Sequence, residues 1–337
     1  MKYVKPSYYW DFTCKAQACQ DNCCRVGWRI AVDEQSYCSL SDHHEPIFKK
    51  LCSAIKLDDE GYYINGGECP ALSEDGLCEI AKNYGDEELG YICRMHPRFI
   101  NEYSDRTEYG LGLACEEAAR LIMFDVCTVY RCIDSGDGEG ETDEKAERLI
   151  ELRESLMHFI TCNGALNDKI AGMLMYIQRI APLYANEEYE SAESVKLQEI
   201  KLTKNAEPQN VAELTEVFKG LEILDEKWPK ALDKARVNSK STAFDGNLKR
   251  IFNYFLYRYF VSYSLDGDMM GAVKLAAVSV ILLRLLFMDK NKYRRINLAH
   301  MYSKEVEYNE ENLENLLFEF YTNEIFETEN IIKALAN

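Results

Sequence analysis

Beyond residue 142, apolar residues recur along most of the chain at spacings of three and four, the period of a helix that buries one face. Thr142 suits the cap of the first such helix, because its hydroxyl can accept from the free N–H groups of a first turn. No short alternating strands with strand-helix-strand spacing occur here, so this half is predicted to be all-α. The predicted helices cover residues 147–161, 169–184, 212–224, 248–265, 269–288, 311–321 and 329–337.

The helix predicted over Met269–Met288 approaches the length and apolar character of a membrane span. Lys274 and Arg284 fall inside it, and a charge near the centre of a bilayer is costly. We therefore predict a helix buried in a protein core, with both charged heads reaching outward to solvent along their apolar stems.

The first third of the chain is less periodic and richer in glycine and loops, particularly between residues 57 and 110. Residues 28–33 and 61–65 suit short strands, and residues 42–55 and 115–131 suit helices. Small loop-rich regions are often organised by a bound metal or cluster rather than by apolar burial.

An acidic, glycine-rich stretch at 133–147 can neither bury surface nor hold regular structure before its last residues. It contains GDGEG, the glycine spacing of a nucleotide loop, but no apolar strand precedes it and its acids would repel phosphate. We predict a mainly α protein. A cysteine-rich, loop-rich, metal- or cluster-binding domain with a few short strands covers 1–132, a linker covers 133–147, and an all-helical domain covers 148–337.

The charge balance points to a protein partner. Asp plus Glu number 57 against 39 Lys plus Arg, which gives a formal net charge of −18. Such a surface repels nucleic-acid phosphate and anionic membranes and attracts cationic groups such as lysine side chains, although solubility alone also explains it. The first residues lack the apolar core of a secretion signal, so a cytoplasmic location is expected.

Cysteine is concentrated at the start of the chain, with 12 of the 13 cysteines before position 133. In the cytoplasm disulfides are disfavoured, so a dense cluster indicates metal, cluster or redox chemistry. Five cysteines with apolar helical neighbours or no cysteine nearby are interpreted as small buried packing residues: Cys38, Cys52, Cys127, Cys132 and Cys162. The candidate metal ligands are Cys14, Cys19, Cys23, Cys24, Cys69, Cys78, Cys93 and Cys115.

Thiolates bind both iron and zinc, and a tetrahedral site needs four of them, so two sites are possible by number alone. If Cys23 and Cys24 lie in an extended segment, they point to opposite faces and do not both bind one ion. His96 is the only histidine beside a grouped cysteine, and we do not expect it to be a ligand. The spacing does not decide between zinc and an iron–sulfur cluster.

The cysteines lie in motifs that resemble a known family. These motifs are FTCKAQACQDNCCRVGWRIAVDEQSY from Phe12, the C-P-x-L-x3-G-x-C-x-I pattern from Cys69, CRMHPR from Cys93 and ACEEAARLI from Ala114. Together they resemble the flagellin lysine N-methylases of bacteria, within a wider group named for a CxxCxxCC pattern and described as chelating iron or zinc. The resemblance covers Phe12–Ile122, about a third of the chain. The gaps here are four and three residues rather than two and two, so which four thiols ligate stays open.

This resemblance implies methyl transfer from S-adenosylmethionine to lysine side chains of flagellin. It also implies an iron–sulfur centre, expected to be 4Fe-4S, held by the N-terminal cysteines, and the eight grouped cysteines match the motif positions. No strand-borne GxGxG loop is present, so a Rossmann-type donor site is not supported. The donor is therefore expected to bind on another surface.

Methylation requires a neutral lysine amine, whose lone pair is free only after the ammonium, with a pKa near about 10.4, loses its proton. The weak candidates for a base or an aromatic face are Tyr254, Tyr257, Tyr259, Glu116 and Glu117. At a spacing of three, Tyr254 and Tyr257 share one helix face and Tyr259 turns partly away. Ordinary helix packing is the alternative for all three tyrosines.

Two other functions stay open from the residues. One is a non-enzymatic zinc- or iron-binding module that recruits a protein partner, and the other is a cluster-containing redox protein. The oligomeric state, the target lysines and the number of methyl groups added are not indicated by the sequence.

Overall fold

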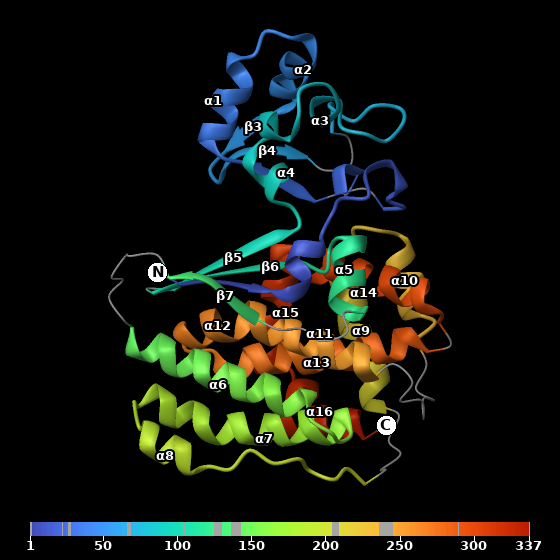
Figure 1. The fold of residues 1–337 in the computed structure, drawn as a ribbon. Coiled ribbons are helices and arrows are strands. Elements are labelled where there is room, and N and C mark those ends of the chain that lie inside the picture. Colours follow the sequence, from blue (N-terminus) through green and yellow to red (C-terminus); the bar gives the residue numbers. More distant parts are fainter. Residues whose placement is uncertain are drawn as a thin grey trace.

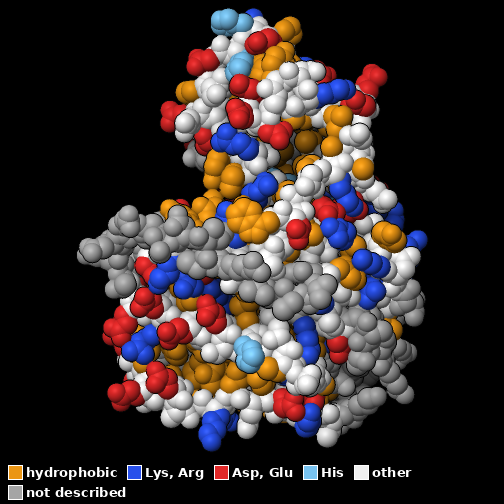
Figure 2. Space-filling model, viewed as in Figure 1, with side chains coloured by type: hydrophobic (Ala, Val, Ile, Leu, Met, Phe, Trp, Pro, Cys, Tyr) orange, Lys and Arg blue, Asp and Glu red, His pale blue; other side chains and the backbone are white. Residues whose placement is uncertain are grey.

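The computed structural model describes residues 2–21, 23–25, 28–65, 69–103, 105–124, 130–135, 143–203, 209–235, 245–288 and 290–336. A small module stands on a four-stranded sheet, which in turn covers a larger helical body (Figure 1). Hydrophobic side chains are exposed around the narrow junction between the module and the rest (Figure 2).

The small module has its own sheet and its own core. Its antiparallel strands lie in the order β2 (Arg29–Val32), β4 (Gly61–Asn65) and β3 (Lys56–Asp58). The two strands predicted from the sequence are confirmed in β2 and β4. The helices of the module are α1 (Glu34–Asp42), α2 (Pro46–Ala54), α3 (Glu79–Asn83) and α4 (Tyr91–Met95). The core side chains are Val32, Leu40, Phe48, Leu51, Ile64, Ala71 and Ile80.

The four-stranded sheet was not predicted. Its order is β5 (Arg98–Tyr103), β6 (Arg106–Leu111), β1 (Lys2–Pro6) and β7 (Tyr130–Ser135), with β1 parallel to β6 and antiparallel to β7. The alternation that reveals a strand is broken in β6, where Glu108 is fully buried. Arg153 donates to both Glu108 carboxylate oxygens, at 2.6 and 2.7 Å. Because a partner distant in sequence satisfies this charge, the local pattern hides the strand.

The helical body confirms the mainly α prediction, and within the described part of 148–337 no strand occurs. Helices α8, α10 and α14 were not predicted, and the predicted helix over 115–131 ends at Phe124. The body contains α5 (Glu116–Phe124), α6 (Glu144–Thr161), α7 (Leu166–Ala185), α8 (Tyr189–Ser194), α9 (Gln209–Gly220), α10 (Lys227–Leu232), α11 (Asp245–Phe255), α12 (Val261–Leu265), α13 (Met269–Phe287), α14 (Lys292–Val306), α15 (Glu310–Thr322) and α16 (Thr328–Leu335).

Helix α13 is buried within the helical body, as predicted. Among the described helices it alone has the length and hydropathy of a membrane span, and 89% of its apolar window is buried inside the fold. The prediction that its charged heads reach solvent is wrong. Lys274 is buried and donates to the Phe320 carbonyl at 2.7 Å, while Arg284 pairs with Asp245 at 3.0 Å. A buried charge needs a polar partner, and neighbouring helices supply one in each case.

Regular structure extends into both ends of the predicted linker 133–147. Strand β7 continues to Ser135, and α6 begins at Glu144. The cap of α6 is Asp143, whose carboxylate accepts from the N–H groups of Lys145 and Ala146. Thr142 lies outside the described residues. The two hydrophobic cores do not follow the predicted boundary at residue 132, since Tyr8 and Tyr103 belong to the core of the helical body. The division into domains at these boundaries stays a prediction.

Candidate functional site

The loop that contains the first cysteines is fastened to α5 mainly by the carboxylate of Glu116. Glu116 accepts from Lys15 Nζ at 2.8 Å and from the Gln20 N–H at 3.2 Å. The Cys19 thiol lies 3.8 Å from the same carboxylate. Burial opposes ionisation of Glu116, but the bonds from Lys15 and Gln20 outweigh it and lower the pKa of this carboxyl.

Glu117 is also engaged. It forms an ion pair with Arg120 at 2.6 Å and lies 3.7 Å from Lys15. The two acids that the sequence analysis named as candidate bases therefore hold the cysteine loop and α5 in place. Neither is left free to accept a substrate proton in this arrangement.

One set of thiols gathers around Cys93. The residue as a whole is exposed, but many atoms surround its thiol. This burial of the thiol, together with the nearby thiols of Cys69, Cys23 and Cys78, raises the pKa of Cys93 to about 12. A turn after Cys69 explains part of this convergence. The Cys69 carbonyl accepts from the Leu72 N–H, and Leu72 forms an isolated β-bridge with Cys78. The motif from Cys69 to Ile80 thus folds its two cysteines toward each other.

A second set joins Cys14, Cys19 and Cys115. Burial raises the pKa of Cys115 to about 12, and the thiols of Cys19 and Cys23 contribute. Burial also raises the pKa of Cys19, with contributions from Glu116, Cys23 and Cys14. Cys23 is a neighbour of both sets. All eight grouped cysteines, drawn from segments up to 101 residues apart, therefore lie in one region of the fold.

The expectation that Cys23 and Cys24 point to opposite faces is wrong, because these residues lie in a 3-10 turn and not in an extended segment. The Cys24 thiol bonds to Cys23, and this bond lowers the pKa of Cys23 to about 7, with help from the Lys304 ammonium. The same bond raises the pKa of Cys24. One thiolate is thus favoured in the pair.

The donor chemistry of this region suits iron or zinc, since its side chains are mainly soft thiols. In the described residues, however, no three His, Cys, Asp or Glu side chains are arranged so as to hold a metal ion. Metal binding would have to remove protons from thiols whose pKa is raised and draw them closer together.

Cys38, Cys52 and Cys162 belong to neither set of thiols. Cys38 and Cys162 are exposed, which corrects their interpretation as buried packing residues, and Cys162 lies 3.4 Å from His158. Cys52 is partly buried against the core of the small module. Cys127 and the side chain of Cys132 lie outside the described residues.

Helix α14 presents a polar face to the cysteine loop. This polar face was not predicted from the sequence. His300 and Lys304 both bond to Asp21 Oδ2 at 2.8 Å, and Asp21 lies between Cys19 and Cys23. His300, Ser303, Lys304 and Glu307 are spaced three or four apart and are all buried. The signal was available, because these polar residues occupy the positions that apolar residues fill in a packed helix.

Glu307 is the centre of a buried cluster of tyrosines. Tyr254 and Tyr259 donate to its Oε1 at 2.7 and 3.0 Å, and Arg258 donates to the Tyr254 hydroxyl at 2.7 Å. Tyr257 instead donates to the Tyr109 carbonyl at 3.1 Å. The rings of Tyr254 and Tyr257 both lie against Phe99, at 6.3 and 6.2 Å, as expected for residues that share a face, although their hydroxyls bond to different groups. The prediction that Tyr259 turns away from Tyr254 is wrong, because both bond to Glu307. Residues 256–260 form a π-helical turn, which brings residues five apart together.

Four buried atoms in this neighbourhood have no hydrogen-bond partner. They are His96 Nε2, His300 Nδ1, Ser303 Oγ and Glu307 Oε2. We call this group, with the tyrosines that bond to Glu307, the α14 polar cluster. Unpaired buried polar atoms cost free energy, so such a concentration is typical of a site that binds something.

Two aromatic rings pack against His96 of the α14 polar cluster. The centroids of Trp28, His96 and Tyr308 lie 5.7 to 5.9 Å from one another. Gly112 is required beside them, because a side chain there would meet the Tyr308 hydroxyl at 1.9 Å. Burial first, and then nearby cationic groups, lower the pKa of His96 to about 4, so this ring is neutral.

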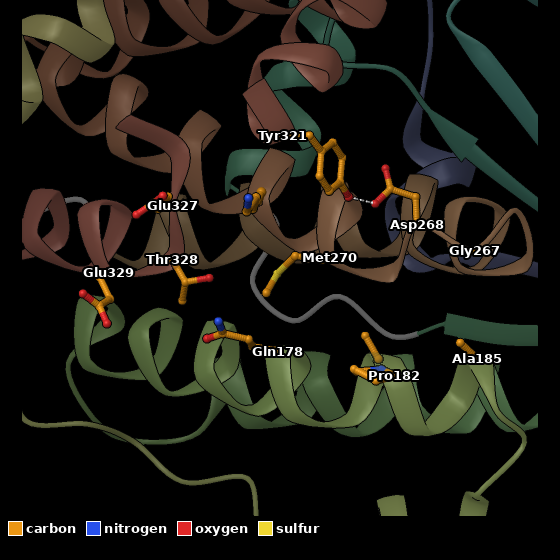
Figure 3. Close-up of a pocket in the computed structure, with 12 residues that line it drawn as sticks. Gln178, Pro182, Ala185, Gly267, Asp268, Met270, Tyr321, Glu327, Thr328 and Glu329 are labelled. Carbon is orange, nitrogen blue, oxygen red and sulfur yellow. Dashed lines mark hydrogen bonds between the residues drawn. The ribbon is translucent and has the colours of Figure 1, made fainter. Parts of the chain in front are cut away.

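A cavity of about 670 Å³ lies elsewhere, in the helical body, and shares no residue with the cysteines or the α14 polar cluster. Figure 3 shows Gln178 and Pro182 of α7 facing Met270, while Tyr321 bonds to Asp268. Among the described lining residues, none has a buried polar atom without a partner. The cavity therefore lacks the unsatisfied groups that mark the other region.

Comparison with known proteins gives a family match and partial relatives. The family model described as FliB lysine N-methylase C-terminal domain matches residues 147–334, more than half of the chain. Lysine-N-methylases of Salmonella choleraesuis (strain SC-B67) and Salmonella typhimurium (strain LT2) are each 32% identical over 136 residues, 36% of this chain and 32% of theirs. The flagellar biosynthetic protein FliU of Salmonella muenchen is 28% identical over 131 residues, 36% of this chain and 77% of its own.

The chain thus spans about a third of the length of the two lysine-N-methylases that it matches. No solved structure matches it.

Proposed function

The chain belongs to the FliB lysine N-methylase family, and from this membership we propose that it transfers methyl groups from S-adenosylmethionine to lysine side chains of flagellin. The observation that supports this most directly is the position of the α14 polar cluster. His300, Ser303 and Glu307 of this cluster lie within the family match, whereas the eight grouped cysteines precede it. The cluster and the cysteines meet where Asp21 bonds to α14.

Glu307 is the residue to which we assign contact with the substrate amine. Two tyrosines and Arg258 fix its Oε1, which leaves Oε2 as an oriented acceptor without a partner. A lysine ammonium placed there would find a carboxylate for its proton, in surroundings where water does not compete. The faces of Tyr308 and Trp28 would favour a cationic group beside it.

The cysteine loop covers this face of α14. Asp21 is about two-fifths exposed, and its bonds to His300 and Lys304 are the polar contacts that hold the loop there. His300 and Lys304 are buried, so the loop can separate from α14 only if water or another acidic group replaces Asp21 as their partner. Such a separation would admit a substrate side chain to Glu307.

For the metal we propose an iron–sulfur cluster, with zinc as the alternative, held by thiols of the set that contains Cys23, Cys69, Cys78 and Cys93. When bound, such a cluster supplies redox-active iron and, at an iron without a cysteine ligand, a coordination position for a small molecule. The acidic surface, with a net charge of −18, would attract a lysine-bearing protein substrate. We propose the cytoplasm as the location.

Protein purified without oxygen, then mixed with methyl-labelled S-adenosylmethionine and flagellin, tests this function. We expect label on flagellin lysines by mass spectrometry, and iron and sulfide in the purified protein. Flagellin that stays unlabelled with iron-loaded protein would contradict the methylase proposal. Label with zinc-loaded protein only would contradict the iron–sulfur part and leave the reaction intact.

A matched pair of variants tests the assigned residue. Glu307→Gln keeps the size and the hydrogen bonds from the tyrosines but cannot take a proton. Glu311→Gln changes an exposed acid nearby in sequence. We expect the first to lose labelling and the second to keep it, with both folded by circular dichroism.

A further inference from the structure

One lysine of the described chain is surrounded by aromatic rings. Lys5 Nζ lies 4.8 Å from the ring centroid of Tyr9, 4.6 Å from that of Trp10 and 4.5 Å from that of Tyr109. The three rings come from the 3-10 turn after β1 and from β6, the strand beside β1. We call Lys5 and these rings the Lys5 cage.

The ammonium of Lys5 has no carboxylate partner in the described part of the chain. Among the residues that the structure describes, neither a hydrogen bond nor an ion pair involves its Nζ, although the chain has 57 acids. Lys2 on the same strand pairs with Asp105 at 2.7 Å, and Lys15 pairs with Glu116 at 2.8 Å. Burial and the charge of Arg98 lower the pKa of Lys5, so its neutral amine is more accessible than that of an ordinary surface lysine.

The Lys5 cage is open to reagents. Trp10 is 60% exposed, and Lys5 itself is partly exposed. It also borders the cysteine loop, because Arg98 lies over both Tyr9 and Phe12, at 5.9 and 5.1 Å, and Phe12 is two residues before Cys14. A lysine that is unpaired, partly exposed and beside the segment that leads into the cysteine loop has the chemistry of a substrate.

Resting on the proposed function, we infer that Lys5 is itself methylated, and that the Lys5 cage is the pocket in which the methylated side chain is held. The Nζ lone pair attacks the methyl carbon of the sulfonium donor, and a new C–N bond forms. The C–S bond breaks with its electron pair going to sulfur, which leaves a neutral thioether. The amine proton is released to water.

The rings explain why the product is retained. Methylation keeps the positive charge and replaces N–H groups, which need hydrogen-bond partners, by methyl groups, which do not. Aromatic faces attract such an ammonium, and recognition of methyl-lysine by aromatic cages uses this attraction. A lysine paired with a carboxylate would instead lose N–H bonds on methylation.

The test is a methyl-labelling experiment on the full chain, purified without oxygen, with labelled S-adenosylmethionine and flagellin in one tube. Peptide mass spectrometry is expected to find label on Lys5 and none on Lys2. Lys5→Arg should abolish label on the N-terminal peptide and leave flagellin labelling unchanged, whereas Lys2→Arg should change neither. Trp10→Ala should reduce label on Lys5 without affecting flagellin.

The outcomes separate the two proposals. Labelled flagellin with unlabelled Lys5 would overturn methylation of Lys5 and leave the methylase function standing. If neither is labelled by metal-loaded protein, both are overturned. Equal label on Lys2 and Lys5 would show surface reactivity without selection by the rings, and would also overturn the assignment.

Discussion

The ion pair between Glu108 of β6 and Arg153 of α6 fastens the four-stranded sheet to the helical body, and its removal gives a measurable prediction. Both side chains are at most 2% exposed, and two bonds of 2.6 and 2.7 Å join them. Arg106 also lies 3.3 Å from Glu108. Removing one partner of a buried pair leaves an uncompensated charge, which costs about 3–5 kcal/mol.

The two single variants should differ. Glu108→Leu leaves Arg153 buried without a counter-charge, so we expect it to lower the free energy of unfolding by about 3–5 kcal/mol. Arg153→Met leaves Glu108 with Arg106, so a loss of about 2–3 kcal/mol is expected, the value of a charged hydrogen bond. The double variant should lose about 2–3 kcal/mol less than the sum of the two single losses, which is the coupling energy of the pair.

Urea unfolding followed by circular dichroism at neutral pH measures all four proteins. If the single losses simply add in the double variant, or if Glu108→Leu costs less than about 1 kcal/mol, water reaches the pair and the reasoning from burial fails.

Three further predictions concern the site. Cys23→Ala should release bound metal and destabilise the small module, because metal binding is coupled to folding. Cys162→Ala is the control and should keep the metal. Equal metal content in both variants would refute the grouping of the thiols. Glu307→Gln should abolish labelling of flagellin while the melting temperature changes little, and a large drop in that temperature would make the role structural. The pKa of His96, lowered from 6.5 to about 4, makes a contribution to stability that is present above pH 6.5 and lost as the pH falls through about 4. Between pH 6.5 and 4, the free energy of unfolding of His96→Phe should therefore fall by about 3 kcal/mol less than that of the unsubstituted protein. Urea unfolding without metal measures this, and an unchanged pH dependence would contradict the shift.

Local periodicity was sufficient for much of the helical body. Helix α13 was recognisable because nearly every one of its positions is apolar, and β2 and β4 because short β-branched and aromatic runs lie between turns. The strands of the larger sheet were not recognisable. Strand β1 has only five residues and ends in Pro6, and its parallel partner β6 lies about 100 residues away.

The candidate site divides in the same way. Motif spacing picked out the eight thiols, and the fold brings them into one region, but whether they hold a metal stays a prediction. Of the residues proposed from the sequence, Glu116 fastens the loop and Tyr257 bonds to a backbone carbonyl. Tyr254 and Tyr259 instead bond to Glu307. A π-helical turn shifted which tyrosines meet, and no local pattern indicated it.

The sequence by itself determined the helical class of the second half, the buried central helix and the family resemblance, because these depend on residue type and short spacing. Only the tertiary structure decided that Asp21 meets His300 and Lys304, 279 and 283 residues away, and that Glu307 keeps one unpaired oxygen. The physical reason is that a polar group is tolerated in a core only if partners satisfy it. Those partners come from distant segments, so their identity is fixed by the packing of the whole chain.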